Sequence, residues 1–143
     1  DLIKASWLRK EIEMEEIILK AIEGMNKSYS PYSKFKVGAA LLMKDGKYIT
    51  GCNIENAAYG SCMCAERSTM FTAHNLGYNL KEDVVKMCIV GATVGPISPC
   101  GSCRQVMNEL LSKDLVVVLA NTRGLTKEVT VKDLLPYSFD DLA

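Results

Sequence analysis

Two short segments, each with cysteines where an α-helix is expected to begin, constrain the fold of this chain more than any other feature. The first is Cys64-Ala65-Glu66-Arg67 and the second is Pro99-Cys100-Gly101-Ser102-Cys103. Cysteines separated by two residues suit a tetrahedral zinc site, and at a helix start they share one face. Helix N-termini also lower thiol pKa values, which helps to keep sulfur ionised for coordination. We therefore expect the fold to bring two helix starts together around one zinc ion.

The number of cysteine ligands separates two interpretations of this site. A structural zinc has four protein ligands, whereas a catalytic zinc keeps one position for water. Cys62, Cys64, Cys100 and Cys103 could together form a closed structural site. Cys62 lies ahead of the helix start, however, and a structural site gives no reason for Glu66. Because side chains in a first helical turn lean towards the N-terminus, Cys64 and Glu66 can both reach a site beyond the helix end, which favours the catalytic interpretation.

Arg67 bears on the charge of such a site. Three thiolates around a dication leave one net negative charge, which weakens zinc as a Lewis acid. Arg67 follows Cys64 by three residues and so lies on the same side of the helix. We expect its guanidinium group and the two helix dipoles to offset part of that negative charge together.

The rest of the sequence alternates helical and strand-like patterns. We expect helices near residues 14–25, 63–75 and 100–111, and strands near residues 35–43, 48–54, 84–93, 115–120 and 128–131. Asp45-Gly46 between the first two strands is typical of a hairpin turn. This order predicts an α/β fold, a three-layer α/β/α sandwich around a mixed five-stranded sheet. We see no linker or repeat and expect one domain over residues 1–143, in which residues 1–12 could be an extension.

Composition excludes several classes of partner. Lysine plus arginine number 17 and aspartate plus glutamate number 17, so no excess positive charge is available to bind nucleic acid. The apolar runs are far shorter than the roughly 18 residues of a membrane span. No signal-like segment opens the given sequence, and we expect a cytoplasmic protein whose six cysteines serve as thiols or metal ligands.

Beyond the two cysteine motifs, the chain resembles the cytidine deaminase family, in its small homotetrameric branch with cysteine zinc ligands. The similarity covers nearly the whole chain from about Glu13. The matching segments are Ser30-Pro31-Tyr32-Ser33-Lys34-Phe35, Val37-Gly38-Ala39-Ala40, Gly51-Cys52-Asn53-Ile54-Glu55-Asn56-Ala57, Cys64-Ala65-Glu66-Arg67, Pro99-Cys100-Gly101-Ser102-Cys103-Arg104-Gln105 and Leu134-Leu135-Pro136. The resemblance implies zinc-dependent hydrolysis of free cytidine and deoxycytidine to uridine and deoxyuridine with release of ammonia, in pyrimidine salvage. A deaminase of another aminated nucleoside is the nearest alternative.

The resemblance also implies a role for individual residues. Cys64, Cys100 and Cys103 resemble the zinc ligands, and Glu66 resembles the proton shuttle. The substrate contacts that it implies are Phe35 against the pyrimidine ring, Asn53 and Glu55 on the ribose, the backbone N–H of Ala65 on the base carbonyl, and Phe139 in a neighbouring subunit's pocket. The last match is weaker, because Tyr137-Ser138-Phe139-Asp140 only approximates the family ending. Active sites at the subunit interfaces of a homotetramer are therefore part of the expectation.

Some of these residues also have a purely structural interpretation. Phe35 could be an ordinary core residue at the start of a strand. Asn53 and Glu55 could be turn formers after a strand. The acidic cluster Glu11, Glu13, Glu15 and Glu16 is interpreted as a solvated helix face, without an assigned function.

Overall fold

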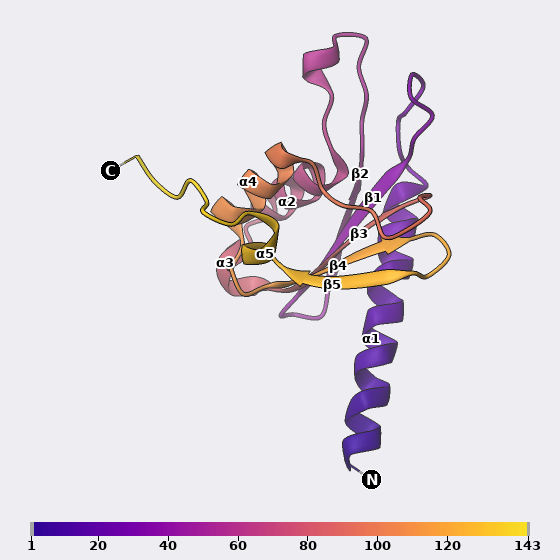
Figure 1. The fold of residues 1–143 in the computed structure, drawn as a ribbon, viewed down its shortest axis with the longest axis vertical. Coiled ribbons are helices and arrows are strands. Elements are labelled where there is room, and N and C mark those ends of the chain that lie inside the picture. Colours follow the sequence, from indigo (N-terminus) through magenta and orange to yellow (C-terminus); the bar gives the residue numbers. More distant parts are fainter. Residues whose placement is uncertain (1, 143) are drawn as a thin grey trace.

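The computed structural model describes residues 2–142, which contain a mixed five-stranded sheet at their centre (Figure 1). In spatial order the strands are β2 (Tyr48–Cys52), β1 (Val37–Met43), β3 (Val84–Gly91), β4 (Val116–Asn121) and β5 (Thr126–Thr130). Strands β3 and β4 are parallel, and every other neighbouring pair is antiparallel. The predicted strands and hairpin are confirmed, and Gly46 in the hairpin turn has a φ of 85°.

Helices cover both faces of this sheet, which confirms the predicted three-layer α/β/α sandwich. Helix α1 (Leu2–Met25) packs on one face against β1, β2 and β3. Helices α2 (Ala65–Asn75) and α4 (Gly101–Leu110) lie on the other face, with the short helices α3 (Leu80–Asp83) and α5 (Val131–Leu134) beside them (Figure 1). A short 3-10 turn, η1 (Tyr59–Ser61), lies in the loop between β2 and α2.

The strands supply two cores because their side chains alternate between the faces. Leu41 and Ile89 point into the core under α2 and α4, whereas Ala40 and Val90 point into the core under α1. The central strands are apolar on both sides, as expected for strands covered by helices on both faces. Cys88 is fully buried in the second core, and burial raises the pKa of its thiol to about 12.

Two strand glycines let helices approach the sheet closely. A Cβ atom at Gly38 would overlap the carbonyl oxygen of Ala21 in α1, and one at Gly51 would overlap the side chain of Thr69 in α2. The second contact matters for the site, because it sets the N-terminus of α2 beside the end of β2.

Helix α1 begins earlier than predicted. The apolar spacing indicates a helix only from about Met14, but residues 2–13 continue the same helix with exposed side chains and project from the body (Figure 1). This segment is rich in residues of high helix propensity and contains neither glycine nor proline. The region expected to be an extension is therefore helical. Among residues 2–142, we find no helix with the length and apolar character needed to cross a bilayer.

Candidate active site

Two helix starts meet on one side of the sheet, as the cysteine motifs predict. Cys64 is the N-cap residue of α2 and Cys100 is the N-cap residue of α4, and both have extended backbone conformations. Their Sγ atoms lie 3.8 Å apart. The Sγ atom of Cys103, in the first turn of α4, completes a cluster in which all three atoms lie within 4.8 Å of one another.

This cluster fits a zinc ion. Zinc–sulfur bonds of about 2.3 Å in a tetrahedron place sulfur atoms about 3.8 Å apart, which is the separation of Cys64 and Cys100. Burial and the negative charges of Glu66 and Cys64 raise the pKa of the Cys103 thiol. Burial alone would raise the pKa of the Cys100 thiol, but hydrogen bonds from Cys103 and Cys64 lower it. A cation between the sulfur atoms would relieve the repulsion among three thiolates in this partly buried site.

The Arg67 side chain reaches the sulfur cluster, as its spacing from Cys64 predicts. Its Nη2 atom donates a hydrogen bond of 3.3 Å to Sγ of Cys64. This bond is the main reason that the pKa of Arg67 is raised, and Cys103 contributes to the shift. A fixed positive charge therefore lies directly against the sulfur cluster.

Cys62 does not belong to the cluster. Its Sγ atom instead lies 3.7 Å from the carbonyl oxygen of Asn56, in the loop that contains η1. Within the part of the chain that the structure describes, the metal-binding group contains three cysteines and no fourth His, Cys, Asp or Glu ligand. The geometry therefore does not form the closed four-cysteine site that the sequence left open.

Glu66 is a buried acid beside the cluster. It lies in the first turn of α2, is only 4% exposed, and interacts with the Cys103 thiol. Burial raises its pKa above the ordinary value, which is the direction expected for a group that must accept and return a proton near neutral pH. Cys64 and Glu66 both line one cleft.

A cleft of about 880 Å³ lies in front of the cluster and collects most of the residues that the sequence singles out. Its lining includes Phe35, Asn53, Glu55, Cys64, Ala65, Glu66, Arg67 and Cys100. The peptide N–H groups of a first helical turn have no partner inside the helix. The N–H of Ala65, at the start of α2, is thus in a suitable place to bind an acceptor in the cleft.

Phe35 lies in a loop before β1 rather than in the strand, so its interpretation as an ordinary core residue is wrong. The side chain is 42% exposed and lines the cleft. Asn53 holds the end of this loop: its Nδ2 donates to the carbonyl oxygen of Phe35 at 2.8 Å, and its Oδ1 accepts the N–H of Val37 at 3.0 Å. The residue immediately before Phe35, Lys34, has a φ of 61°, a backbone conformation that is uncommon outside glycine.

Glu55 holds the other end of the loop. Its carboxylate accepts the N–H groups of Tyr32 and Ser33 at 3.0 and 3.1 Å, and it also accepts the Ser33 hydroxyl group. These bonds lower the pKa of Glu55. Ile54, between Asn53 and Glu55, exchanges two backbone hydrogen bonds with Met63, and this pairing joins the end of β2 to the segment that leads to Cys64.

Two serines that orient these groups have no role predicted from the sequence. The Ser33 hydroxyl group bonds Glu55 and also accepts the N–H of Phe35 at 3.0 Å. The Ser28 hydroxyl group donates to Oδ1 of Asn53 at 2.5 Å. The turn signal around Ser33 could have indicated a side-chain-to-backbone bond. Nothing local indicates the partner of Ser28, which is 25 residues away.

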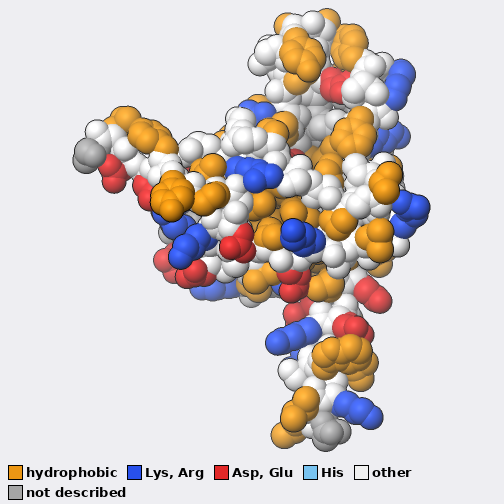
Figure 2. All heavy atoms as spheres, in the orientation of Figure 1, with side chains coloured by type: hydrophobic (Ala, Val, Ile, Leu, Met, Phe, Trp, Pro, Cys, Tyr) orange, Lys and Arg blue, Asp and Glu red, His pale blue; other side chains and the backbone are white. Residues whose placement is uncertain are grey.

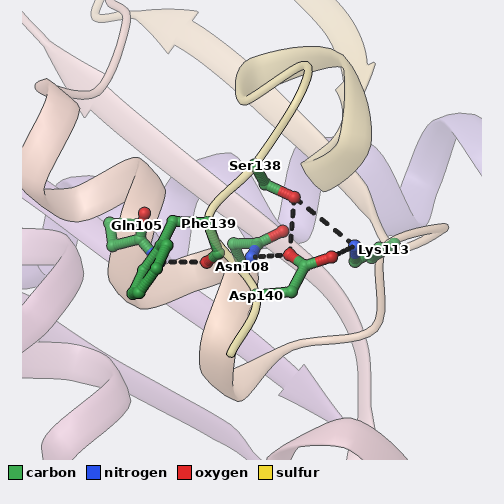
Figure 3. A network of polar contacts seen from close by, with 6 residues as sticks. All are labelled: Gln105, Asn108, Lys113, Ser138, Phe139 and Asp140. Atoms are coloured by element: carbon green, nitrogen blue, oxygen red, sulfur yellow. Dashed lines mark hydrogen bonds and ion pairs between the residues drawn. The ribbon is translucent and has the colours of Figure 1, made fainter. Parts of the chain in front are cut away.

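Phe139 does not line the cleft of its own chain. It lies in the C-terminal segment, which follows α5 and runs beside α4. Its side chain is 62% exposed. The only polar contact of this residue drawn in Figure 3 is at its backbone, where the carbonyl oxygen accepts a 2.8 Å hydrogen bond from Nε2 of Gln105.

The fold and the cluster together define a zinc-binding α/β protein with a buried acid at the metal site. Residues 12–119 match the family model described as the cytidine and deoxycytidylate deaminase zinc-binding region, and the chain belongs to this family. It is 48% identical over 128 residues to a cytidine deaminase of Halalkalibacterium halodurans, covering 90% of this chain and 95% of that protein. The structure resembles the crystal structure of a Burkholderia pseudomallei cytidine deaminase with a TM-score of 0.84 and 50% identity, covering 87% of this chain and 98% of that chain. A cytidine deaminase from Mycobacterium tuberculosis gives a TM-score of 0.76 at 32% identity, covering 90% and 98% of the two chains.

Proposed function

We propose that this chain is a zinc-dependent cytidine deaminase that hydrolyses free cytidine and deoxycytidine to uridine and deoxyuridine with release of ammonia. The observation that carries the proposal is the position of Glu66, a buried carboxylate in the same cleft as the three-cysteine cluster. Cys64, Cys100 and Cys103 would hold the zinc ion, and Arg67 offsets part of their charge. When bound, the ion supplies the Lewis acidity that makes water nucleophilic near neutral pH.

Glu66 carries the protons of the reaction. Its carboxylate accepts a proton from the attacking water and delivers it to N3 of the pyrimidine, which makes C4 electrophilic. Water oxygen adds at C4, and a second proton transfer through Glu66 lets the amino group leave as ammonia. The burial that raises the pKa of Glu66 favours a carboxyl group that can hold the proton between these two transfers.

The cleft supports a nucleoside rather than a base or a nucleotide. Phe35 offers an aromatic face to the pyrimidine, the Ala65 N–H faces the base carbonyl, and Asn53 and Glu55 offer polar groups to the ribose. A bare base would lack the proposed ribose contacts, so cytosine is expected to be a poor substrate. Arg67 is the one basic residue among the described residues that line the cleft, and it is engaged with Cys64, which leaves no phosphate pocket.

A homotetramer with shared active sites is also part of the proposal. Phe139 is exposed and lies away from the cleft of its own chain, which supports a role in the cleft of a neighbouring copy. Dilution to monomers should then abolish turnover, and a fully active monomer would contradict the shared site.

We further propose that residues 1–143 fold as one domain and that the enzyme acts in pyrimidine salvage in the cytoplasm, where thiol ligands stay reduced.

One assay tests substrate and metal together. Conversion of cytidine is followed by ultraviolet absorbance with untreated protein, with protein treated with a zinc chelator, and with treated protein after zinc is restored. We expect turnover, loss of turnover and recovery, respectively. Equal turnover of cytidine and cytosine would refute the sugar contacts. Turnover of a different aminated nucleoside, without turnover of cytidine, would support the alternative that the enzyme deaminates another nucleoside.

A further inference from the structure

Gly91 is the last residue of β3, at the end of the sheet where the cleft lies. Side chains alternate along a strand, so position 91 is on the same face as Met87 and Ile89, which lie in the core under α2 and α4. The residue paired with Gly91 on β1 is Val37, which lines the cleft. A side chain at position 91 would therefore point towards the floor of the cleft.

Ile97 occupies the space over Gly91. A Cβ atom at position 91 would lie 2.7 Å from Cδ1 of Ile97 and 3.5 Å from Cζ of Phe35. The first distance is shorter than real Cβ atoms allow, whereas the second is ordinary van der Waals contact. Two side chains, one from the loop before β1 and one from the loop before α4, therefore both lie over this one glycine.

The backbone of Ile97 is held by β4, the strand next to β3. Its N–H donates a 3.2 Å hydrogen bond to the carbonyl oxygen of Ala120. Its side chain reaches back over β3, packs against the core under α2 and α4, and lines the cleft. Because Ile97 precedes Cys100 by three residues, one loop supplies both an apolar side chain and a sulfur atom of the cluster.

Phe35, Val37 and Ile97 form an apolar surface over Gly91, which we call the cleft floor. All three line the same cleft as Glu66. In the space-filling view, hydrophobic side chains gather beneath the projecting loop that contains η1 (Figure 2). An apolar floor suits the ring of a nucleoside base, because the ring and the side chains are both removed from water on binding.

We propose that Gly91 is a positioning residue that sets the depth of the cleft for the nucleoside base by leaving room for Ile97. The inference rests on the proposed deaminase function and deepens it, because it adds Ile97 to the residues that contact the base. A methyl group at position 91 would displace Cδ1 of Ile97, the free end of a flexible side chain. Since the backbone of Ile97 is fixed to Ala120, the displaced end moves into the cleft and takes space from the base.

Steady-state kinetics of two single variants measure the depth of the floor. In Gly91→Ala we expect KM for cytidine to rise by at least about fivefold, the lower end of the cost of overpacking a filled site, with kcat and zinc content unchanged. Ile97→Val removes only Cδ1, and KM should rise by about two- to fourfold, the order expected for one lost methyl contact. Gly95→Ala is the matched control, because it lies in the same loop as Ile97 and a Cβ atom there meets nothing within 4 Å.

The double variant, Gly91→Ala with Ile97→Val, separates a role in the cleft from a merely structural one. It moves one methyl group from residue 97 to residue 91 and keeps the volume of the floor. The overlap disappears, because the next atom of Ile97, Cγ1, lies 3.7 Å from the position of the new methyl group. We expect KM to return to within about twofold of that of the unmodified protein.

Two outcomes would overturn the role of Gly91. One is a KM in the double variant as high as the product of the two single effects predicts. The other is a Gly91→Ala variant that loses folding stability but keeps its KM, because the glycine would then serve packing alone. Absence of cytidine turnover by the unmodified, zinc-loaded protein contradicts the deaminase function and the inference that rests on it, and it is recognised before any variant is made.

Discussion

The carboxylate of Glu55 accepts hydrogen bonds from the hydroxyl group and the backbone N–H of Ser33. The same hydroxyl group accepts a hydrogen bond from the backbone N–H of Phe35. Ser33 therefore connects a residue proposed to bind the ribose with the aromatic ring proposed to contact the base. The two contacts proposed to recognise a nucleoside are thus linked through one side chain.

Ser33→Ala should loosen this loop without touching the metal site. We expect KM for cytidine to rise by about fivefold, the order expected for one lost hydrogen bond. Zinc content should not change. Ser112→Ala, at an exposed position outside the cleft, is the control. An unchanged KM in Ser33→Ala would show that the Phe35 loop does not need this bond.

Glu66→Gln should separate proton transfer from metal binding. The substitution preserves shape and leaves the three sulfur ligands in place, but the amide cannot carry a proton. We expect kcat to fall by at least about 10² to 10⁴ fold, the range for general acid–base catalysis, while one zinc per chain is retained. Metal analysis and kinetics on the same sample check both points, and retained turnover would refute the role of Glu66.

Serine substitutions of single cysteines should distinguish ligands from other thiols. Cys64→Ser, Cys100→Ser and Cys103→Ser should each lower zinc content and abolish turnover, because each removes one of three sulfur donors. Cys62→Ser should keep both, since Cys62 lies outside the cluster and contacts Asn56. Loss of zinc from the Cys62→Ser variant would support the interpretation as a structural site with four cysteine ligands.

Gly38→Ala tests the close packing of α1 on the sheet. The added methyl group would overlap the carbonyl oxygen of Ala21, so α1 must move away from β1. We expect the free energy of unfolding to fall by about 2 to 4 kcal/mol, a typical cost of overpacking a core. Urea denaturation measures the change. Gly60→Ala, where a Cβ meets nothing within 4 Å, should be close to neutral.

Asp140 forms an ion pair with Lys113 at 2.8 Å, and the pH dependence of this contact follows from the lowered pKa of Asp140. The pKa of Asp140 in the folded protein lies below the ordinary 3.8. Above pH 3.8 the carboxylate therefore contributes its full stabilisation to the folded state. This stabilisation is lost as the pH falls through the pKa of the folded protein. The position of the C-terminal segment should therefore not change between about pH 5 and 8. Carbon NMR of the Asp140 carboxyl group should give a midpoint below 3.8, and Lys113→Ala should raise it. A midpoint at or above 3.8 in the unmodified protein would contradict the ion pair with Lys113.

The sequence predicts the strands and the pairing of Cys100 with Cys103 well because both depend on local patterns. The continuous apolar run of β4, for example, specifies a strand with two covered faces. Cys100 and Cys103 are two residues apart at a helix start, so the helix itself brings them together. The start of α1 was less predictable, since residues 2–13 have no buried face to give a pattern and are helical through propensity alone.

The sequence by itself determined which groups are proposed to carry the chemistry: the three thiols, the acid next to one of them and the aromatic and polar residues around them. Only the tertiary structure decided that Cys62 stays outside the cluster and that Asn53 and Glu55 hold the Phe35 loop. It also decided that Phe139 is not among the residues that line the cleft of its own chain. The physical reason is distance along the chain. Short spacings are fixed by helix and strand geometry, whereas contacts such as Ser28 with Asn53 or Asn108 with Asp140 exist only once the sheet and its helices have packed.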